Sequence, residues 1–285
     1  MTGLEHSGGL LGATEIRTLA AELALVPTKK LGQNFVHDAN TVRKIVAKAR
    51  VTPGERVLEV GPGLGSLTLG LLEAGATVCA VEIDGRLAEL LPTTAARLQP
   101  GRALQVIHAD ALVTTEIPHD VNVIVANLPY NTSVPIVLHL LATLPSLTRV
   151  LVMVQAEVAE RLAAGPGSKA YGGPSVKAAW YGTWSIAGTV SRQVFWPVPN
   201  VDSLLVAMEA RPAPGDDELR QVVWDLVDYG FATRRKMSRG ALASYLGPDR
   251  VSQVITAAGL NPEDRGEAWS LEGYVALAHT WLAMR

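Results

Sequence analysis

The sequence predicts an α/β fold, in which a doubly wound, mostly parallel seven-stranded sheet is followed by a small all-helical C-terminal domain. Two observations support this class. Short β-branched runs alternate with helical patterns over residues 53–211, and their connections, about twenty residues long, leave room for crossover helices. After a segment rich in proline and glycine at residues 212–215, only helical patterns follow.

The first two elements are expected to be helices, because apolar residues recur at helical spacing over residues 14–25 and 39–50. Five near-continuous apolar runs then predict parallel strands that are buried on both faces. They are residues 57–60, 77–81, 104–108, 122–126 and 150–154. Two further strands, residues 184–190 and 204–208, follow without room for a long helix, so we expect an antiparallel pair at the sheet edge.

Four helical patterns make up the expected C-terminal domain: residues 217–230, 235–246, 250–258 and 270–284. The chain of 285 residues has about twice the length of a typical domain, which agrees with one large and one small domain. We expect residues 1–52 to hold the N-terminal helices, residues 53–211 the sheet, and residues 212–285 the C-terminal helices.

The composition is typical of a soluble globular protein, since 48% of the residues are apolar, 18% are charged and the mean hydropathy is +0.20. The longest apolar run, residues 134–145, is interrupted by His139 and is far shorter than the roughly 20 residues of a membrane-spanning helix. No secretory signal is expected, and a single cysteine, Cys79, excludes an internal disulfide. These features predict a cytoplasmic protein that is not bound to a membrane.

The net charge of −2 conceals an uneven distribution. Residues 17–56 carry eight Lys and Arg against three Asp and Glu, a balance of +5, whereas residues 57–148 carry three against eight, a balance of −5. One interpretation is a basic leading segment that binds an anionic polymer. The other is a solvated amphipathic helix, which composition alone favours.

A glycine loop follows the first strand. Gly61, Gly63 and Gly65 separate Val60 from a helical pattern, and such a turn lets a nucleoside-type ligand approach the N–H groups of a helix N-terminus. The fingerprint of dinucleotide-binding proteins has glycine at its first, third and sixth positions, whereas the sixth position here is Ser66. The spacing therefore disfavours a nicotinamide-dependent dehydrogenase.

Acidic residues lie at or near the ends of the first three strands. Glu82 lies 21 residues after Gly61, where a carboxylate can accept both ribose hydroxyls, although a solvent-facing strand end is the alternative. Asp110 can accept a hydrogen bond from an adenine amino group or cap a helix. Together Glu59, Glu82 and Asp110 predict a negative potential that suits a sulfonium cation, and hence S-adenosylmethionine rather than NAD.

The fourth strand ends in the turn Asn127-Leu128-Pro129-Tyr130. An exocyclic amine such as adenine N6 is a poor nucleophile, because its lone pair is delocalised into the ring. The side-chain oxygen of Asn127 and the carbonyl of Leu128 could accept its two hydrogens and direct the lone pair toward a methyl donor, while Tyr130 stacks on the flipped base. The alternative is an ordinary strand-to-helix turn with a buried tyrosine.

This turn, together with the glycine loop, resembles the corresponding motifs of N6-adenine methyltransferases. Three further segments narrow the resemblance to the KsgA/RsmA family of small-subunit ribosomal RNA adenine dimethyltransferases. They are Leu-Gly-Gln-Asn-Phe-Val-His-Asp at 31–38, Phe-Trp-Pro-Val-Pro-Asn-Val-Asp-Ser at 195–203 and Phe-Ala-Thr-Arg-Arg-Lys at 231–236. The resemblance extends from about residue 14 to the C-terminus, with the segments in the family's order.

The resemblance implies a Rossmann-like class I methyltransferase fold with an N-terminal cofactor lid and a C-terminal domain that contacts RNA. The implied cofactor-binding residues are Gln33, Asn34, Val36, Gly61, Gly63, Glu82, Ile83, Asp110, Ala111 and Asn127. The implied catalytic residues are Asn127, Leu128, Pro129, Tyr130 and Phe195, with Phe195 opposite Tyr130 around the target adenine. The implied RNA-binding residues are Arg234, Arg235 and Lys236 at a helix start.

Two departures from the family pattern are visible. Val36 stands where the family usually has leucine, and residues 238–241 replace the usual continuation of the basic cluster. The first substitution costs little, because the contact is apolar or made by the backbone. The second leaves the RNA contacts of the helical domain less well defined than the chemistry.

The implied function is S-adenosylmethionine-dependent dimethylation of N6 of two adjacent adenines in the 3′-terminal hairpin loop of small-subunit (16S) ribosomal RNA, coupled to ribosome biogenesis. The expected partner is the immature 30S subunit, and the expected state is a monomer. We expect no metal, since the six histidines lack ligand spacing. Three alternatives stay open: a resistance-type methyltransferase of large-subunit RNA, a non-catalytic assembly factor, and the disfavoured oxidoreductase.

Overall fold

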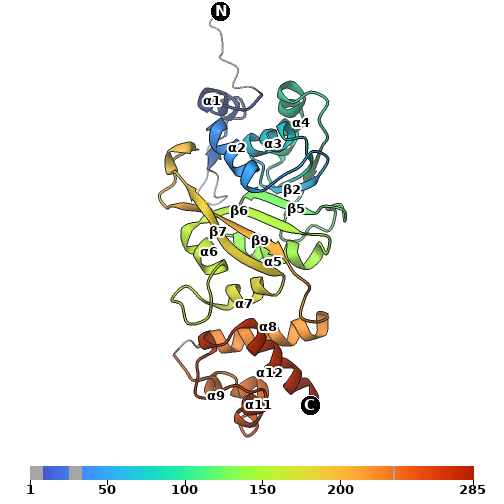
Figure 1. Cartoon of the computed structure of the whole chain (residues 1–285). Helices are drawn as coiled ribbons and strands as arrows, with labels where there is room; N and C mark the ends of the chain where they lie inside the picture. The colour runs from blue at the N-terminus through green and yellow to red at the C-terminus, as the bar shows by residue number, and fades with distance from the viewer. Residues whose placement is uncertain (1–8, 26–33, 234) are drawn as a thin grey trace, which may run out of the picture. The chain divides into compact units, whose positions relative to one another are not determined.

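A computed structural model describes residues 9–25, 34–233 and 235–285 (Figure 1). The chain forms two compact units, and each is made of two segments. Unit 1 comprises Met1–Ala159 and Ser185–Glu209, and unit 2 comprises Glu160–Trp184 and Ala210–Arg285. Residues 1–52, which the sequence sets apart, fall in the same unit as the sheet, and residues 160–184 group with the C-terminal helices.

A seven-stranded sheet organises the fold, as the sequence predicts. Its strands are β2 (Arg56–Val60), β3 (Thr77–Glu82), β4 (Leu104–His108), β5 (Val123–Asn127), β6 (Arg149–Gln155), β7 (Gly182–Val190) and β9 (Ser203–Ala210). The order is β4-β3-β2-β5-β6-β9-β7, in which the first five strands are parallel and β9 is antiparallel to β6. The chain order reverses between β2 and β5, so the carboxyl ends of these strands border the crevice where open α/β sheets bind ligands.

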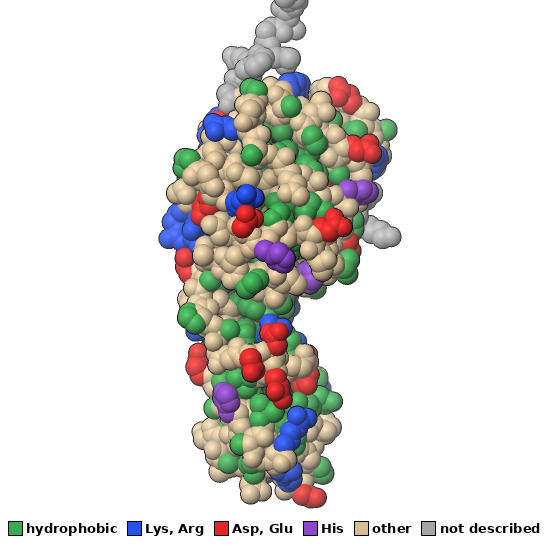
Figure 2. Space-filling model, turned by 90° about the vertical axis from the view of Figure 1, so that its right-hand side faces the viewer, with side chains coloured by type: hydrophobic (Ala, Val, Ile, Leu, Met, Phe, Trp, Pro, Cys, Tyr) green, Lys and Arg blue, Asp and Glu red, His purple; other side chains and the backbone are tan. Residues whose placement is uncertain are grey.

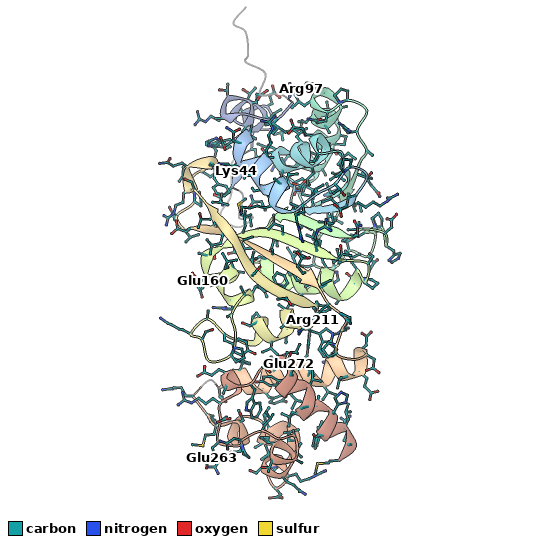
Figure 3. The ribbon with its side chains drawn as sticks, viewed as in Figure 1. Lys44, Arg97, Glu160, Arg211, Glu263 and Glu272 are labelled. Carbon is teal, nitrogen blue, oxygen red and sulfur yellow. The ribbon has the colours of Figure 1, made fainter. Side chains whose placement is uncertain are left out.

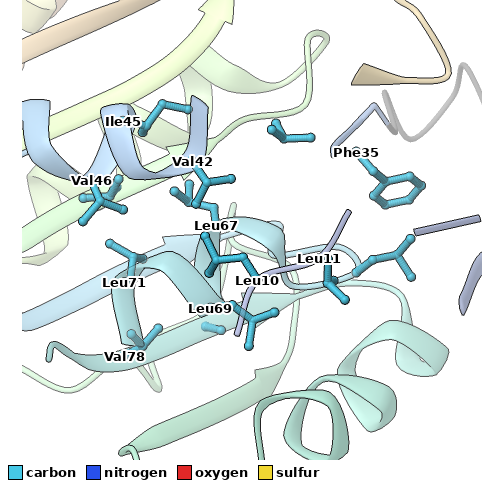
Figure 4. Close-up of a cluster of buried hydrophobic side chains, with 14 of the residues drawn as sticks. Leu10, Leu11, Phe35, Val42, Ile45, Val46, Leu67, Leu69, Leu71 and Val78 are labelled. Atoms are coloured by element: carbon cyan, nitrogen blue, oxygen red, sulfur yellow. The ribbon is translucent and has the colours of Figure 1, made fainter. Parts of the chain in front are cut away.

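Three helices connect parallel strands of unit 1, as the βαβ pattern predicts: α3 (Ser66–Glu73), α4 (Gly85–Leu98) and α5 (Ser133–Thr143). Two helices, α1 (Ala13–Glu22) and α2 (Ala39–Lys48), precede the seven-stranded sheet, and α6 (Ala156–Leu162) leads into unit 2. Figure 4 shows Val42 and Val46 of α2 beside Leu67 and Leu71 of α3 in the aliphatic core. A Cβ atom on Gly70 would lie 2.4 Å from Val42, so the close approach of these two helices requires glycine there.

A two-stranded antiparallel sheet, not predicted from the sequence, joins β1 (Phe35–Val36) to β8 (Phe195–Trp196). Phe35 is paired with Trp196 and Val36 with Phe195, and the rings of Phe35 and Trp196 stack with centroids 6.3 Å apart. Strands of two residues carry no periodicity. Their pairing nevertheless ties the segment before α2 to the segment before β9.

Unit 2 is built from helices around a core rich in aromatic rings. The helices are α7 (Gly173–Ala179), α8 (Asp217–Ala232), α9 (Ser238–Ala241), α10 (Ala243–Leu246), α11 (Val251–Ala257) and α12 (Leu271–Ala283). The prediction of one continuous helix over residues 235–246 is wrong. The backbone at Leu242, with a ψ of −2°, separates α9 from α10. Among the described residues, no helix has both the length and the apolar character that a membrane span requires.

Candidate active site

The glycine loop between β2 and α3 adopts a backbone that the sequence makes possible. Gly61, Gly63 and Gly65 have φ values of +67°, +59° and +95°, a region that other residues rarely occupy. A Cβ atom on Gly63 would lie 2.8 Å from the ring of Phe35, whereas a Cβ atom on Gly61 would meet no heavy atom nearer than 4.0 Å. Gly63 thus allows β1 to approach, and Gly61 leaves space above the loop.

This space belongs to a cavity of about 100 Å³ at the carboxyl ends of β2, β3 and β5. It collects eight of the predicted site residues from four separate segments of unit 1: Asn34, Val36, Gly61, Gly63, Glu82, Ile83, Asn127 and Pro129. A second cavity, of about 150 Å³, shares Gly61, Glu82, Ile83 and Pro129 with the first and adds Asp110 and Ala111. The two cavities therefore form one elongated site with Glu82 at its middle.

Glu82 connects the glycine loop to the end of β3. Its side chain is 5% exposed, its Oε2 accepts a hydrogen bond from Gly63 N (3.1 Å), and its Oε1 accepts one from Asp84 N (2.9 Å). Burial raises the pKa of this carboxyl, and the two backbone hydrogen bonds oppose the rise. The interpretation of Glu82 as a solvent-facing strand end is wrong, because the side chain lines both cavities.

Glu59 is a second buried carboxyl in the first cavity, with 1% of its surface exposed. Its Oε2 accepts a hydrogen bond of 2.5 Å from the hydroxyl of Thr68 on α3. The pKa of Glu59 is raised to about 8, because burial and, to a smaller extent, the nearby Glu82 outweigh the opposing hydrogen bond from Thr68. Glu59 is therefore mostly protonated at pH 7, and the negative potential is weaker than three carboxylates would give.

Asp110 follows β4 and lines the second cavity. Its Oδ1 accepts a hydrogen bond from Leu112 N (2.9 Å), and its backbone carbonyl accepts one from Thr114 N (3.0 Å). The carboxyl therefore caps a turn rather than a helix. This arrangement leaves Oδ2 as a further acceptor at the edge of the cavity.

The turn after β5 places the side-chain amide of Asn127 in the lining of the first cavity, beside residues 34–36 and the glycine loop. Asn127 Nδ2 donates a hydrogen bond to the carbonyl of Asn34 (3.0 Å), which turns Oδ1 away from that carbonyl. Leu128 is 2% exposed, and its N–H donates to Met153 O (3.1 Å). Because Asn127 and Pro129 both line the first cavity, the interpretation as an ordinary structural turn is disfavoured.

Tyr130 and the backbone at Val36 are each held by a serine hydroxyl to which the sequence gives no such role. The phenol of Tyr130 hydrogen-bonds to Ser203 Oγ (3.0 Å), and burial raises the pKa of the half-buried phenol. Ser66 Oγ donates a hydrogen bond of 2.5 Å to the carbonyl of Val36. Ser66 and Ser203 do lie in motifs that the resemblance identifies, but no spacing rule pairs either with its partner.

Phe195 is not brought to the cavities. Its side chain is 1% exposed and packs in the core of unit 1 with Phe35, so it presents no free ring face. The expected sandwich of Phe195 and Tyr130 around a base is therefore absent from this arrangement of the described residues. Gln33, the remaining expected cofactor ligand, lies outside the described residues.

The expected RNA-binding residues lie in unit 2. Arg235 and Lys236 are exposed in the turn between α8 and α9, not at a helix start, and Arg234 lies outside the described residues. In the same unit Arg211 and Glu272 form a loose ion pair at 3.9 Å (Figure 3).

The basic residues of the 17–56 segment are partly compensated inside unit 1. Lys44 and Arg97 are exposed (Figure 3). Three other cations of residues 43–56 form ion pairs: Arg43–Glu73, Arg50–Glu209 and Arg56–Asp120. On the face drawn in Figure 2, acidic and basic side chains are mixed rather than segregated. This agrees with the interpretation of α2 as a solvated helix.

Among the described residues, no group of three or more His, Cys, Asp or Glu side chains is placed to hold a metal ion. Cys79 is buried in β3, and burial raises its pKa to about 11, so it remains a thiol at neutral pH.

Comparison with known proteins identifies the family of the chain. Two curated proteins named ribosomal RNA small subunit methyltransferase A are similar over nearly their whole length. The protein from Leifsonia xyli is 62% identical, with 94% of this chain and 98% of that protein covered. The protein from Corynebacterium efficiens is 53% identical, with 96% and 98% covered.

Two solved structures share the fold. A dimethyladenosine transferase from Plasmodium falciparum has a TM-score of 0.69 at 23% identity and covers 85% of this chain and 95% of its own. The 23S rRNA methyltransferase ErmE has a TM-score of 0.64 at 25% identity, with 87% and 99% covered. The model of the family described as ribosomal RNA adenine dimethylase matches residues 27–280. The chain with this cavity and this turn therefore belongs to the ribosomal RNA adenine dimethylase family.

Proposed function

We propose that the protein uses S-adenosylmethionine to dimethylate N6 of two adjacent adenines in the 3′-terminal hairpin loop of small-subunit ribosomal RNA. The observation that carries this proposal is the orientation of Asn127. Its Nδ2 is engaged by Asn34, which leaves Oδ1 as an acceptor beside the cavity that opens above Gly61. The names of the relatives at 53% and 62% identity support the small subunit as the source of the RNA.

The shape of the site supports S-adenosylmethionine as the methyl donor. The open space above Gly61 suits the methionine part, and Glu82 between the two cavities is placed to accept the ribose hydroxyls. Asp110 retains an acceptor for the adenine amino group, while the half-exposed side chain of Ile83 offers an apolar surface for the ring. Bound there, the donor supplies an activated methyl group on a sulfonium sulfur.

The turn after β5 supports transfer to an exocyclic amine. Asn127 Oδ1 and the carbonyl of Leu128 are the acceptors proposed to hold the two hydrogens of adenine N6. By accepting them, these groups concentrate the nitrogen lone pair toward the methyl group and stabilise the positive charge that develops on nitrogen. Pro129 restricts the turn, and Tyr130 stacks on the base.

The remaining steps require no further catalytic side chain. Methylation makes the nitrogen acidic, so its proton leaves without a dedicated base. After the first transfer one hydrogen remains on N6, and a single acceptor, the Leu128 carbonyl, can still hold it. Rate enhancement then comes mainly from the alignment of the amine with the methyl group.

We expect the protein to act as a monomer on immature 30S subunits in the cytoplasm, where ribosomes assemble. Arg235 and Lys236 in unit 2 are exposed cations suited to phosphate contacts. Phe195 would need to leave the core of unit 1 to stack on the base opposite Tyr130.

The proposal is tested by incubating the protein with S-adenosylmethionine and either immature 30S particles or 50S particles. Dimethylated adenine blocks reverse transcription, so primer extension should stop at two adjacent adenines of the small-subunit RNA only. A stop on the large-subunit RNA alone would favour the activity printed for ErmE. Calorimetry that detects no donor binding would favour a non-catalytic assembly factor.

A further inference from the structure

The hydroxyl of Tyr130 is held by a residue that no part of the proposed chemistry uses. Ser203 Oγ lies 3.0 Å from the phenol oxygen, and Ser203 is 2% exposed whereas Tyr130 is only half-buried. Because burial raises the pKa of Tyr130, the phenol keeps its proton at neutral pH and can donate it to Ser203. A buried serine thus holds the phenol oxygen of Tyr130, while the turn after β5 sets the position of its Cα and Cβ atoms.

Ser203 is itself held in place from several directions. It is the first residue of β9 and is paired with Gln155 of β6. The preceding carbonyl, of Asp202, accepts a hydrogen bond from Ala156 N (2.9 Å). The side chain of Ser203 therefore extends from a backbone that the main sheet fixes in register.

Arg192 fastens the loop that leads into Ser203. Its Nε donates to Asp202 Oδ1 (2.6 Å), and its Nη1 donates to the carbonyl of Asn200 (3.0 Å). An ion pair this exposed adds little stability. Its effect is geometric, because one guanidinium holds two points of the short connection between β8 and β9.

An anchored hydroxyl restricts the direction of an aromatic ring. The turn backbone fixes Cβ of Tyr130, and the bond to Ser203 fixes its oxygen, so the long axis of the ring cannot swing about the first side-chain torsion. With Phe195 buried in the core, Tyr130 is the expected stacking residue that offers a partly exposed face in the described part of the chain. The position of a stacked base would follow from the position of this ring axis.

We propose that Ser203 is a positioning residue, which fixes the long axis of the Tyr130 ring and so keeps the N6 atom of a stacked adenine within reach of the acceptors of the Asn127 turn. This inference rests on the proposed function. It adds a residue that touches neither the donor nor the base, and it assigns the phenol hydroxyl an orienting role instead of a chemical one.

The test compares Ser203→Ala, Tyr130→Phe and the double variant in single-turnover methylation of immature 30S particles. Each single variant should lower the rate about fivefold, the usual worth of one hydrogen bond. The double variant should be no slower than the singles, because both changes break the same bond. Donor affinity by calorimetry should stay within about twofold of wild type, since the donor cavity is unchanged.

Two controls distinguish positioning from general loosening. Ser203→Thr keeps a hydroxyl and should restore most of the rate. Ser146→Ala removes a hydroxyl that donates to Val121 O (2.6 Å) elsewhere in unit 1, and it should leave the rate unchanged.

A wild-type rate for Ser203→Ala, multiplied losses in the double variant, or a loss that follows donor affinity would overturn the role of Ser203. Absence of methylation by the wild-type protein would instead contradict the proposed function itself.

Discussion

The two compact units stabilise their interiors by different means. The large core cluster of unit 1 is mainly aliphatic, with Phe35 and Phe195 as its buried rings. The core of unit 2 is rich in aromatic residues: Tyr171, Trp180, Trp269 and Tyr274 are buried, and further rings pack against them. The buried carboxyls among the described residues, Glu59 and Glu82, both lie in unit 1 and both line its first cavity.

The difference indicates which buried groups favour folding in each unit and which oppose it. A buried carboxyl without a cation opposes folding, whereas a buried ring favours it. Unit 1 therefore carries destabilising groups at the place where a cationic ligand is proposed to bind. Unit 2 has no such group among its described residues and serves stability and, by proposal, RNA contact.

The largest effect expected from unit 2 is on stability alone. Leu277 on α12 is fully buried, so Leu277→Ala should lower the free energy of unfolding by about 3 kcal/mol. Urea unfolding followed by tryptophan fluorescence measures this loss. Donor affinity of the folded variant should equal that of wild type, and a clear fall in affinity would break the division of roles between the units.

In unit 1 the corresponding change should act on the ligand. Glu82→Gln removes the charge at the middle of the site while it keeps the shape of the side chain. We expect the free energy of donor binding to weaken by about 2 kcal/mol, which is the typical contribution of a hydrogen bond to a charged acceptor. Calorimetry tests this, with the exposed Glu89→Gln on α4 as the matched control. Equal affinity of the two variants would contradict the role of Glu82.

Glu59 should make the proposed donor binding depend on pH. Its pKa is about 8, and a bound cation would favour the ionised form, so binding should release a proton. Affinity should therefore rise with pH up to about 8, by at most about tenfold per pH unit. Calorimetry at pH 6, 7 and 8 in buffers of different ionisation enthalpy measures both quantities.

Glu59 should also make the stability of the folded protein depend on pH, but stability should fall as pH rises whereas donor affinity rises. Because the folded pKa of Glu59 lies above its unfolded value of 4.5, the folded protein binds the extra proton, and its contribution to stability falls as pH rises from 4.5 to about 8. Glu59→Gln should remove this group's contribution to the pH dependence of donor affinity and to the pH dependence of stability. A variant with an unchanged slope of affinity against pH would show that another group takes up the proton.

The smallest effect is expected for the exposed cations of unit 2. Replacing Arg235 and Lys236 by alanine should weaken RNA binding and reduce the slope of log affinity against log salt by roughly 1 to 2. Filter binding at several salt concentrations tests this, and donor affinity should not change. An unaltered slope would place the RNA contacts elsewhere.

Much of this fold follows from sequence patterns. The parallel strands were predictable because each is a nearly continuous apolar run, and Glu82, Asp110 and Asn127 could be placed at one edge because each follows such a run. The β1 and β8 strands were not, since a two-residue pair depends on contacts between residues 160 positions apart. The break at Leu242 depends on packing within unit 2, which helical periodicity does not encode.

The site residues could be predicted where they lie together in a short sequence motif. Spacing identified the glycine loop and the Asn127 turn, but it could not show that Thr68 binds Glu59 or that Ser203 binds Tyr130. Burial of Glu59 changes its charge, and burial of Phe195 removes it from the cavities. Both corrections arise from tertiary packing, which no local motif records.

The most direct test of the account is the single-turnover rate of Asn127→Ala on immature 30S particles, measured alongside its affinity for S-adenosylmethionine. If the amide oxygen grips the target amine, the rate should fall by about 10³-fold, as when a preorganised polar group is lost from a transition state, while donor affinity stays within about threefold. A variant that methylates as fast as wild type would contradict the account.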